Sequence, residues 1–98
     1  MEIKIYHGDN LTIALSGRLD TVTSTSLLNA FAKEEINEDL VVVDMKELEY
    51  ISSAGLRALL AMKKDLTAKG KNFEVHNPNS VCQEVFRVTG FVNVLNVK

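Results

Sequence analysis

Two adjacent serines, Ser52 and Ser53, stand just before a stretch of helical periodicity and are the residues best placed for chemistry. The first backbone amides of a helix have no partner inside the helix, and the helix dipole favours an anion beside them. A phosphate on either hydroxyl would therefore suit the helix while adding about −1.5 to −2 charges at pH 7. A serine in this place is most often only a helix cap, and the spacing alone is consistent with either role.

Two aspartates, Asp20 and Asp44, also follow predicted strands. The carboxyl ends of parallel strands meet at one edge of a sheet, so we expect both carboxylates to lie near Ser53. A phosphate on that serine would join them and repel a partner fitted to the unmodified surface. Taken singly, Asp20 is better explained as only a helix cap, and Asp44 as only a loop or turn residue.

The patterns of common enzyme and metal sites are missing around these residues. A nucleophile elbow, Gly-x-Ser-x-Gly, needs a glycine where Ile51 stands. Asp44, Ser53 and His76 are the residue types of a hydrolytic triad, but in a different chain order from the α/β-hydrolases. The histidines and the cysteine lack ligand spacing, and no phosphate loop ends in Gly-Lys-Ser or Gly-Lys-Thr. We expect no catalytic residue, no metal and no cofactor.

The composition is that of an ordinary soluble domain, with 98 residues of which 46% are hydrophobic and 24% charged. We expect residues 1–98 to form one domain with Cys82 buried and unpaired. A net charge of −2 provides no basic surface for nucleic acid. No run approaches the roughly 20 apolar residues of a membrane span, so we expect a cytoplasmic protein without membrane insertion.

The elements that must position these residues can be read from the periodicity. The apolar runs Ile3–Tyr6 and Leu11–Leu15, separated by the turn residues His7–Asn10, predict a hairpin whose second strand ends at Ser16-Gly17. The predicted elements that follow are a helix capped by Asp20, a strand Leu40–Val43, a loop Met45–Tyr50 and a helix Ala54–Lys69 before Gly70. After these come a strand Phe73–His76, a helix capped by Ser80 and closed by Gly90, and a last strand Phe91–Leu95.

Strands that alternate with helices indicate an α/β fold with right-handed crossovers. We expect a mixed, mostly parallel sheet with an N-terminal hairpin and three main helices. The wholly apolar run Leu40–Val43 predicts a central strand covered on both faces. The last helix presents its own set of apolar residues, namely Val81, Val85, Phe86 and Val88.

The chain resembles the STAS family, the sulphate transporter and anti-sigma factor antagonist domain, and especially its small stand-alone antagonists of anti-sigma factors. The resemblance covers nearly the whole chain, and its parts are specific together and in this order. They are Leu15-Ser16-Gly17-Arg18-Leu19-Asp20, Val42-Val43-Asp44, Tyr50-Ile51-Ser52-Ser53-Ala54-Gly55-Leu56 and Val85-Phe86-Arg87-Val88-Thr89-Gly90-Phe91.

The resemblance implies a phosphorylation switch at Ser53, which stands two residues before the motif glycine Gly55. Ser52 is the alternative acceptor. Many antagonists have an aspartate where this chain has Ser52, and a second hydroxyl residue where it has Ala54. The unmodified antagonist would bind an anti-sigma factor that is also a serine kinase and thereby free the sigma factor. Phosphorylation would end the complex, a phosphatase would reset it, and the ATP and magnesium would belong to the kinase.

The docking face implied for this partner combines three segments, Leu19–Ser24, Glu47–Ile51 and the start of the second helix. A rival interpretation within the same family is a constitutive subunit of a membrane complex that transports a lipid or an anion. Nothing in the pattern demands a second copy, so we expect a monomer. The predicted partner-binding residues are Asp20, Thr21, Asp44, Ser52, Gly55, Leu56 and Arg57.

Overall fold

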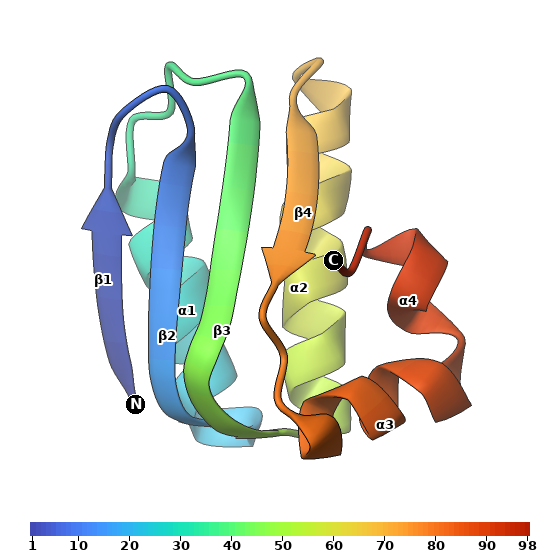
Figure 1. The fold of residues 1–98 in the computed structure, drawn as a ribbon. Helices are drawn as coiled ribbons and strands as arrows, with labels where there is room; N and C mark the ends of the chain where they lie inside the picture. The colour runs from blue at the N-terminus through green and yellow to red at the C-terminus, as the bar shows by residue number, and fades with distance from the viewer.

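Four strands form one mixed sheet in the order β1-β2-β3-β4, in a computed structural model that describes residues 1–98. Strand β1 (Glu2–Tyr6) pairs antiparallel with β2 (Leu11–Leu19). Strands β3 (Leu40–Ile51) and β4 (Asn72–His76) extend the sheet in parallel, as Figure 1 shows. The predicted α/β class, the N-terminal hairpin and the mostly parallel sheet are confirmed.

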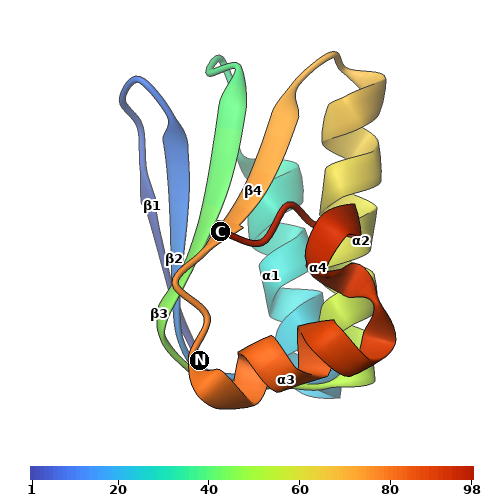
Figure 2. The same ribbon diagram turned by 45° about the vertical axis from the view of Figure 1, so that its right-hand side comes forward.

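Three main helices and one short turn of helix complete the chain. Helices α1 (Thr21–Lys33) and α2 (Ser53–Ala68) pack side by side against the same face of the sheet. Helix α3 (Ser80–Thr89) lies across one end of the molecule, and the short α4 (Phe91–Val94) returns beside α2, as Figure 2 shows. No helix has both the length and the apolar composition that crossing a membrane requires.

The core lies between the sheet and these helices. A cluster of 20 buried hydrophobic side chains holds the layers together. Each fully buried Leu, Ile, Val, Phe or Met contributes about 1.5 to 3 kcal/mol to stability. The strands supply alternate residues and the helices supply residues three or four apart, as their periods require. Fully buried members include Leu11, Ile13, Val41, Val43, Leu59, Met62, Leu66, Phe73 and Phe86.

Leu40–Val43 lies in a central strand, as predicted. The prediction that other elements cover both faces of this strand is wrong. Both α1 and α2 lie on one side of the sheet, and the other side carries no helix (Figure 1). Val42 faces that open side and is only 5% exposed. Its register neighbours Thr12 and Glu74 flank it there. An apolar residue in a central strand is thus covered by its cross-strand neighbours without a second helical layer.

Strands β2 and β3 are longer than predicted, and the expected loop Met45–Tyr50 is part of β3. The register between them shifts after Ala14 and again after Gly17. At each shift, β3 has one residue more than the facing part of β2. The buried residues of this stretch are therefore Met45, Leu48 and Ile51, three apart rather than two. Such bulges break the alternation by which a strand is recognised in a sequence.

The prediction of a fifth strand at Phe91–Leu95 is also wrong. Gly90 ends α3 with φ of 75°, and the chain then forms α4. Only a single bridge, Val75 to Val97, adds to the sheet after β4. Leu95 is fully buried under this turn and anchors the C-terminal segment.

Helix α3 begins one residue earlier than predicted and buries a different stripe. Its cap is Asn79 rather than Ser80, because the Asn79 Oδ1 atom accepts from the Cys82 backbone N–H at 2.8 Å. The buried residues are Cys82 and Phe86, four apart, which confirms the prediction of a buried cysteine. Two of the valines that define its apolar set are largely exposed, at 50% for Val81 and 64% for Val88.

Candidate functional site

The amino termini of α1 and α2 meet at the carboxyl ends of β2 and β3. The Ser52 backbone N–H donates to the Leu19 carbonyl at 2.9 Å, which ties the start of α2 to the residue before Asp20. The paired strand ends therefore bring Asp20 and Ser53 to one end of the sheet, as the sequence predicts. We call this region, formed by residues 20–23 and 52–57, the serine end.

The two serines of the serine end differ in what their hydroxyls do. Ser52 is the N-cap of α2, and its Oγ accepts from the Gly55 backbone N–H at 3.2 Å. Ser53 is the first residue of the helix, is exposed, and its hydroxyl has no hydrogen-bond partner in the structure. The hydroxyl of Ser53 is therefore the one free to react, while that of Ser52 has a structural task.

Asp20 caps α1 through a reciprocal pair of contacts with Thr23. Its Oδ1 accepts from the backbone N–H groups of Val22 at 3.1 Å and Thr23 at 3.0 Å. Its own N–H donates to Thr23 Oγ1 at 2.8 Å, which completes a capping box. Hydrogen bonds from the backbone and then the side chain of Thr23 lower the pKa of the Asp20 carboxyl below its ordinary value.

We expect Asp20→Ala to lower the melting temperature by about a few degrees, because two amides of the first turn lose their acceptor. Asp20→Asn should keep the wild-type melting temperature at pH 7, since asparagine caps helices as well as aspartate does. Because the pKa of Asp20 is lowered, the carboxylate contributes to folding stability above its ordinary pKa, and this contribution is lost as the pH falls through the lowered value.

Thermal unfolding of the Asp20→Ala and Asp20→Asn proteins measures the two melting temperatures. Equal melting temperatures for Asp20→Ala and wild type would contradict the assignment of the cap.

The predicted partner-binding residues differ in exposure, and three of them, Asp20, Asp44 and Ser52, are half-buried. Thr21 and Arg57 are exposed on the first turns of α1 and α2, and Arg57 lies one helical turn after Ser53. Gly55 is buried and Leu56 is 5% exposed, so their side of α2 packs inward. The first pair is open to a partner, whereas the second pair positions the helix.

Asp44 lies far from the serine end, so the prediction that it sits beside Asp20 and Ser53 is wrong. It pairs in register with Ala14 and His76, seven residues before β3 ends at Ile51. At about 3.3 Å per residue, that separation along the strand is about 20 Å. Its carboxylate accepts from the Lys46 backbone N–H at 3.0 Å and from Asn77 Nδ2 at 3.2 Å. The unrecognised extension of β3 is the reason for the error.

Two features, one in the serine end and one just before it on β2 and β3, were missed by the sequence-based prediction. Val22 is 77% exposed on the first turn of α1, directly beyond Asp20. The Arg18 guanidinium stacks over the Tyr50 ring at 4.4 Å from its centroid, across the register pair that precedes Leu19 and Ile51. This contact could be predicted only from the full length of β3. Arg18 and Tyr50 become neighbours because both strands continue past the bulges.

Ser24, one turn into α1, is the only buried side chain with an unpaired polar atom. The residue is 5% exposed and its Oγ has no hydrogen-bond partner. A buried hydroxyl without a partner costs free energy, because it has given up its hydrogen bonds to water.

We therefore expect Ser24→Ala to stabilise the protein by about 0.5 to 1 kcal/mol, from helix propensity and from removal of the unpaired hydroxyl. Ser26→Ala is the matched control, because Ser26 is exposed in the same helix and gains only the propensity. Chemical unfolding of both variants gives the difference. A Ser24→Ala protein less stable than Ser26→Ala would show that the hydroxyl has a stabilising partner.

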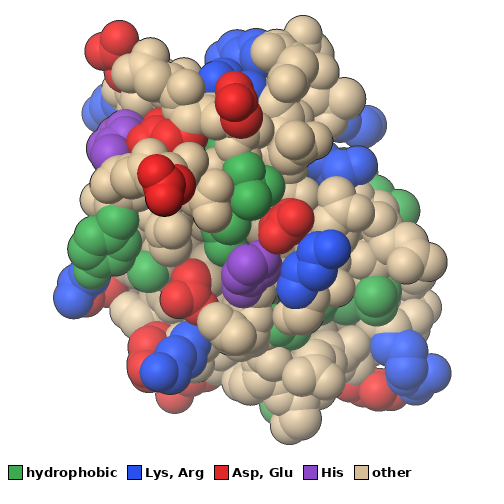
Figure 3. All heavy atoms as spheres, turned by 45° about the horizontal axis from the view of Figure 1, so that its top comes forward, with side chains coloured by type: hydrophobic (Ala, Val, Ile, Leu, Met, Phe, Trp, Pro, Cys, Tyr) green, Lys and Arg blue, Asp and Glu red, His purple; other side chains and the backbone are tan.

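The charged side chains of the chain show no concentration of one sign on the face drawn in Figure 3 and no metal-binding cluster. In the view of Figure 3, acidic and basic side chains are interspersed rather than gathered by sign. No group of three or more His, Cys, Asp and Glu side chains is arranged to hold a metal ion. The serine end therefore offers a modifiable hydroxyl, a carboxylate and an exposed valine for contact with another protein.

A family model described as "Mlab, STAS domain" matches residues 6–96. The chain is also similar to BtrV, a predicted anti-sigma factor antagonist of Bordetella bronchiseptica. The two are 32% identical over 91 residues, which cover 91% of this chain and 78% of that protein.

Solved structures show the same fold. A crystal structure of an anti-sigma factor antagonist from Mycobacterium paratuberculosis has a TM-score of 0.86 at 23% identity, covering 98% of this chain and 83% of that one. The Bacillus cell fate determinant SpoIIAA in its phosphorylated form has a TM-score of 0.75 at 16% identity, covering 99% and 89%. Its unphosphorylated form has a TM-score of 0.70 at 17% identity, covering 88% and 82%.

Proposed function

The chain belongs to the STAS domain family, and on that premise we propose that it is an anti-sigma factor antagonist switched by phosphorylation of Ser53. In its unmodified form it binds an anti-sigma factor that is also a serine kinase, and the sigma factor is released. Transfer of phosphate to Ser53 ends the complex, and a serine phosphatase restores it. The chain itself is the substrate of these reactions and needs no cofactor.

The observation that carries this proposal is the difference between the two serines. The Ser53 hydroxyl is exposed and unpaired at the first position of α2, whereas the Ser52 hydroxyl caps that helix. Phosphate on Ser53 would lie beside the first-turn amides, which favour an anion by about 0.3 to 1 kcal/mol at an exposed site. Modification would thus alter the surface and leave the helix intact. SpoIIAA, a protein of the same fold, is named in both a phosphorylated and an unphosphorylated form, which supports a phosphorylation switch but does not bear on the choice between the two serines.

The serine end also explains why a phosphate would end binding. Asp20 lies at the same end and already carries a negative charge, while Val22 presents an exposed apolar surface beside it. A partner that buries Val22 must also bring its own surface close to Ser53. Two further negative charges in that contact would be desolvated without a matching cation, which costs several kcal/mol.

Partner recovery from the protein's own cells tests the proposal. Tagged wild-type, Ser53→Ala and Ser53→Asp proteins are purified, and the proteins that accompany each are identified and quantified. We expect wild type and Ser53→Ala to retain a protein with a serine kinase domain, and Ser53→Asp to lose it. A partner retained equally by all three, in a membrane fraction, would favour the constitutive transporter subunit instead. Retention by all three of a kinase that leaves Ser53 unmodified would refute the switch.

A further inference from the structure

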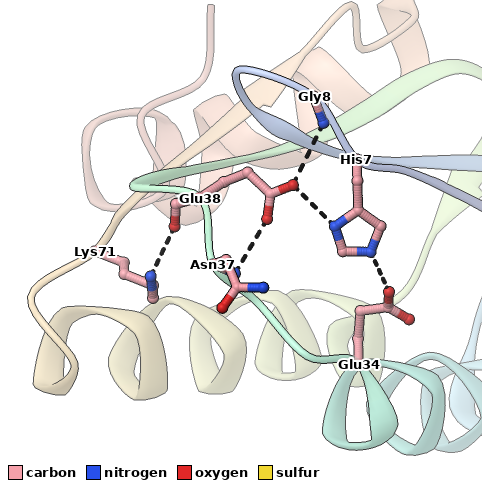
Figure 4. Close-up of polar contacts among 6 residues, drawn as sticks. All are labelled: His7, Gly8, Glu34, Asn37, Glu38 and Lys71. Atoms are coloured by element: carbon pink, nitrogen blue, oxygen red, sulfur yellow. Dashed lines mark hydrogen bonds and ion pairs between the residues drawn. The ribbon is translucent and has the colours of Figure 1, made fainter.

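A second cluster of ionisable side chains lies at the end of the molecule opposite the serine end, where β1 turns into β2 (Figure 1). His7 stands in that turn with a carboxylate on each side of its ring. Its Nδ1 lies 2.8 Å from Glu38 Oε2 and its Nε2 lies 2.5 Å from Glu34 Oε1 (Figure 4). Both glutamates belong to the segment between α1 and β3, so the contacts join two parts of the chain about thirty residues apart.

Glu38 is held in place independently of His7, whereas the only side-chain contact of Glu34 is with the ring. The Glu38 side chain is only 8% exposed. Its carboxylate also accepts from the backbone N–H groups of Gly8 at 3.3 Å and Asn37 at 3.2 Å. From the other side, Lys71 Nζ donates to the Glu38 backbone carbonyl at 2.8 Å. Asp9, the remaining charged residue of the turn, makes no contact with the ring.

The geometry has a chemical consequence. A carboxylate offers only acceptors, so both ring nitrogens of His7 must donate for both contacts to hold. Only the imidazolium has two N–H groups. A neutral ring would turn one lone pair toward a carboxylate lone pair, and one of the two contacts would be lost.

We propose that His7, Glu34 and Glu38 form a pH-sensitive clamp, which fastens the β1–β2 turn to the segment between α1 and β3 when the ring carries two protons and releases one side when it carries one. The clamp is independent of the serine end, which lies at the other end of the sheet. It makes the attachment of the N-terminal hairpin depend on the protonation of one histidine.

The pKa values agree in direction with this geometry. Hydrogen bonds to Glu34 and then Glu38 raise the pKa of His7 above its ordinary value of 6.5. For Glu38, desolvation opposes the charge, but hydrogen bonds from backbone amides and from His7 lower its pKa overall. A raised histidine pKa stabilises the fold fully below the ordinary value, and this contribution is lost as the pH rises through the raised value.

Nitrogen-15 NMR of the His7 ring across pH 5.5 to 9 tests the clamp on the whole chain. We expect the shifts of a doubly protonated ring at pH 6.5, and a titration midpoint that falls when Glu34 and Glu38 are both replaced by Gln. A single neutral tautomer at pH 6.5, or a midpoint unchanged in the Glu34→Gln/Glu38→Gln protein, would overturn the proposal.

Thermal unfolding of His7→Gln supplies a second measurement that does not require the double variant to fold. Gln fills similar space but has no titration, so the melting temperature of wild type should exceed that of His7→Gln most at low pH. The difference should shrink as the pH rises. A difference that is independent of pH between 5.5 and 9 would overturn the clamp, while leaving the proposal for Ser53 unaffected.

Discussion

Ser53→Asp is expected to weaken binding of the proposed anti-sigma factor partner by about 100-fold or more, the equivalent of about 2.7 kcal/mol. The variant places a fixed negative charge at an exposed position, at the same end of the sheet as Asp20 and Val22. Ser53→Ala should bind within about twofold of wild type, because the hydroxyl has no partner to lose. Isothermal titration calorimetry with the purified partner measures both.

Ser80→Asp is the matched control for this prediction. Ser80 is likewise the exposed first residue of a helix, so the variant adds the same charge in the same helical position on α3. We expect it to bind at least tenfold more tightly than Ser53→Asp. Asn79, the residue before Ser80, donates to the Leu48 and Glu49 carbonyls at 3.2 Å, so Ser80 lies near the predicted docking segment Glu47–Ile51. Equal losses for the two variants would therefore mean that the position of Ser53 is not decisive, either because net charge governs the complex or because the docking face extends to α3. Unchanged binding by Ser53→Asp would contradict the electrostatic basis of the switch.

Gly55→Ala is expected to destabilise the protein by about 1 to 3 kcal/mol, which is the usual cost of adding a methyl group to a closely packed contact. A Cβ atom at this position would lie 2.7 Å from Ile51 Cγ1 and 2.9 Å from the Leu19 carbonyl oxygen. The carbonyl is backbone and also accepts the Ser52 N–H, so it cannot move without loosening the start of α2. Urea unfolding measures the change in the free energy of unfolding.

Gly8→Ala is the control for added volume and lost backbone entropy. A Cβ atom there would meet only the Asn10 carbonyl oxygen at 3.8 Å, an ordinary contact. Its stability should therefore stay within about 0.5 kcal/mol of wild type. If Gly55→Ala is equally harmless, the close docking of α2 on the end of β2 is not a constraint. The expected loss of stability in Gly55→Ala would explain why position 55 holds a glycine, although the residue is buried and does not contact a partner.

The order of the elements was predictable because each follows from a local signal. Apolar period and caps identify α1, α2 and α3, and Asp20 was assigned as a cap from the residue type and its place before a helical stripe. The hairpin followed from the turn residues between β1 and β2. These features depend on residues within a few positions of each other.

The errors arose where the signal is not local. The bulges in β3 are defined by its pairing with β2, and without them Met45, Leu48 and Ile51 do not read as a strand. The misplaced Asp44 follows directly from that shortened strand. In the same way, the helical period assigns Val81 and Val88 to an apolar stripe, but the position of α3 across the end of the sheet leaves them exposed.

The serine end itself was largely predictable, yet the choice between its serines was not. From spacing, Ser52 and Ser53 are neighbours with the same chemistry. The structure separates them, because an N-cap hydroxyl turns back to the Gly55 N–H while the next residue points out of the helix. Only coordinates give that difference in hydrogen bonding and exposure.

The most direct test of the phosphorylation switch is mass spectrometry of the protein recovered from its own cells. Trypsin, which cleaves after Lys46 and Arg57, releases the peptide from Glu47 to Arg57, which contains both serines and Tyr50. We expect a fraction of this peptide to carry one phosphate, with fragment ions that place it on Ser53. Phosphate on Ser52 instead, or none under any growth condition while the partner is bound, would contradict the proposed switch.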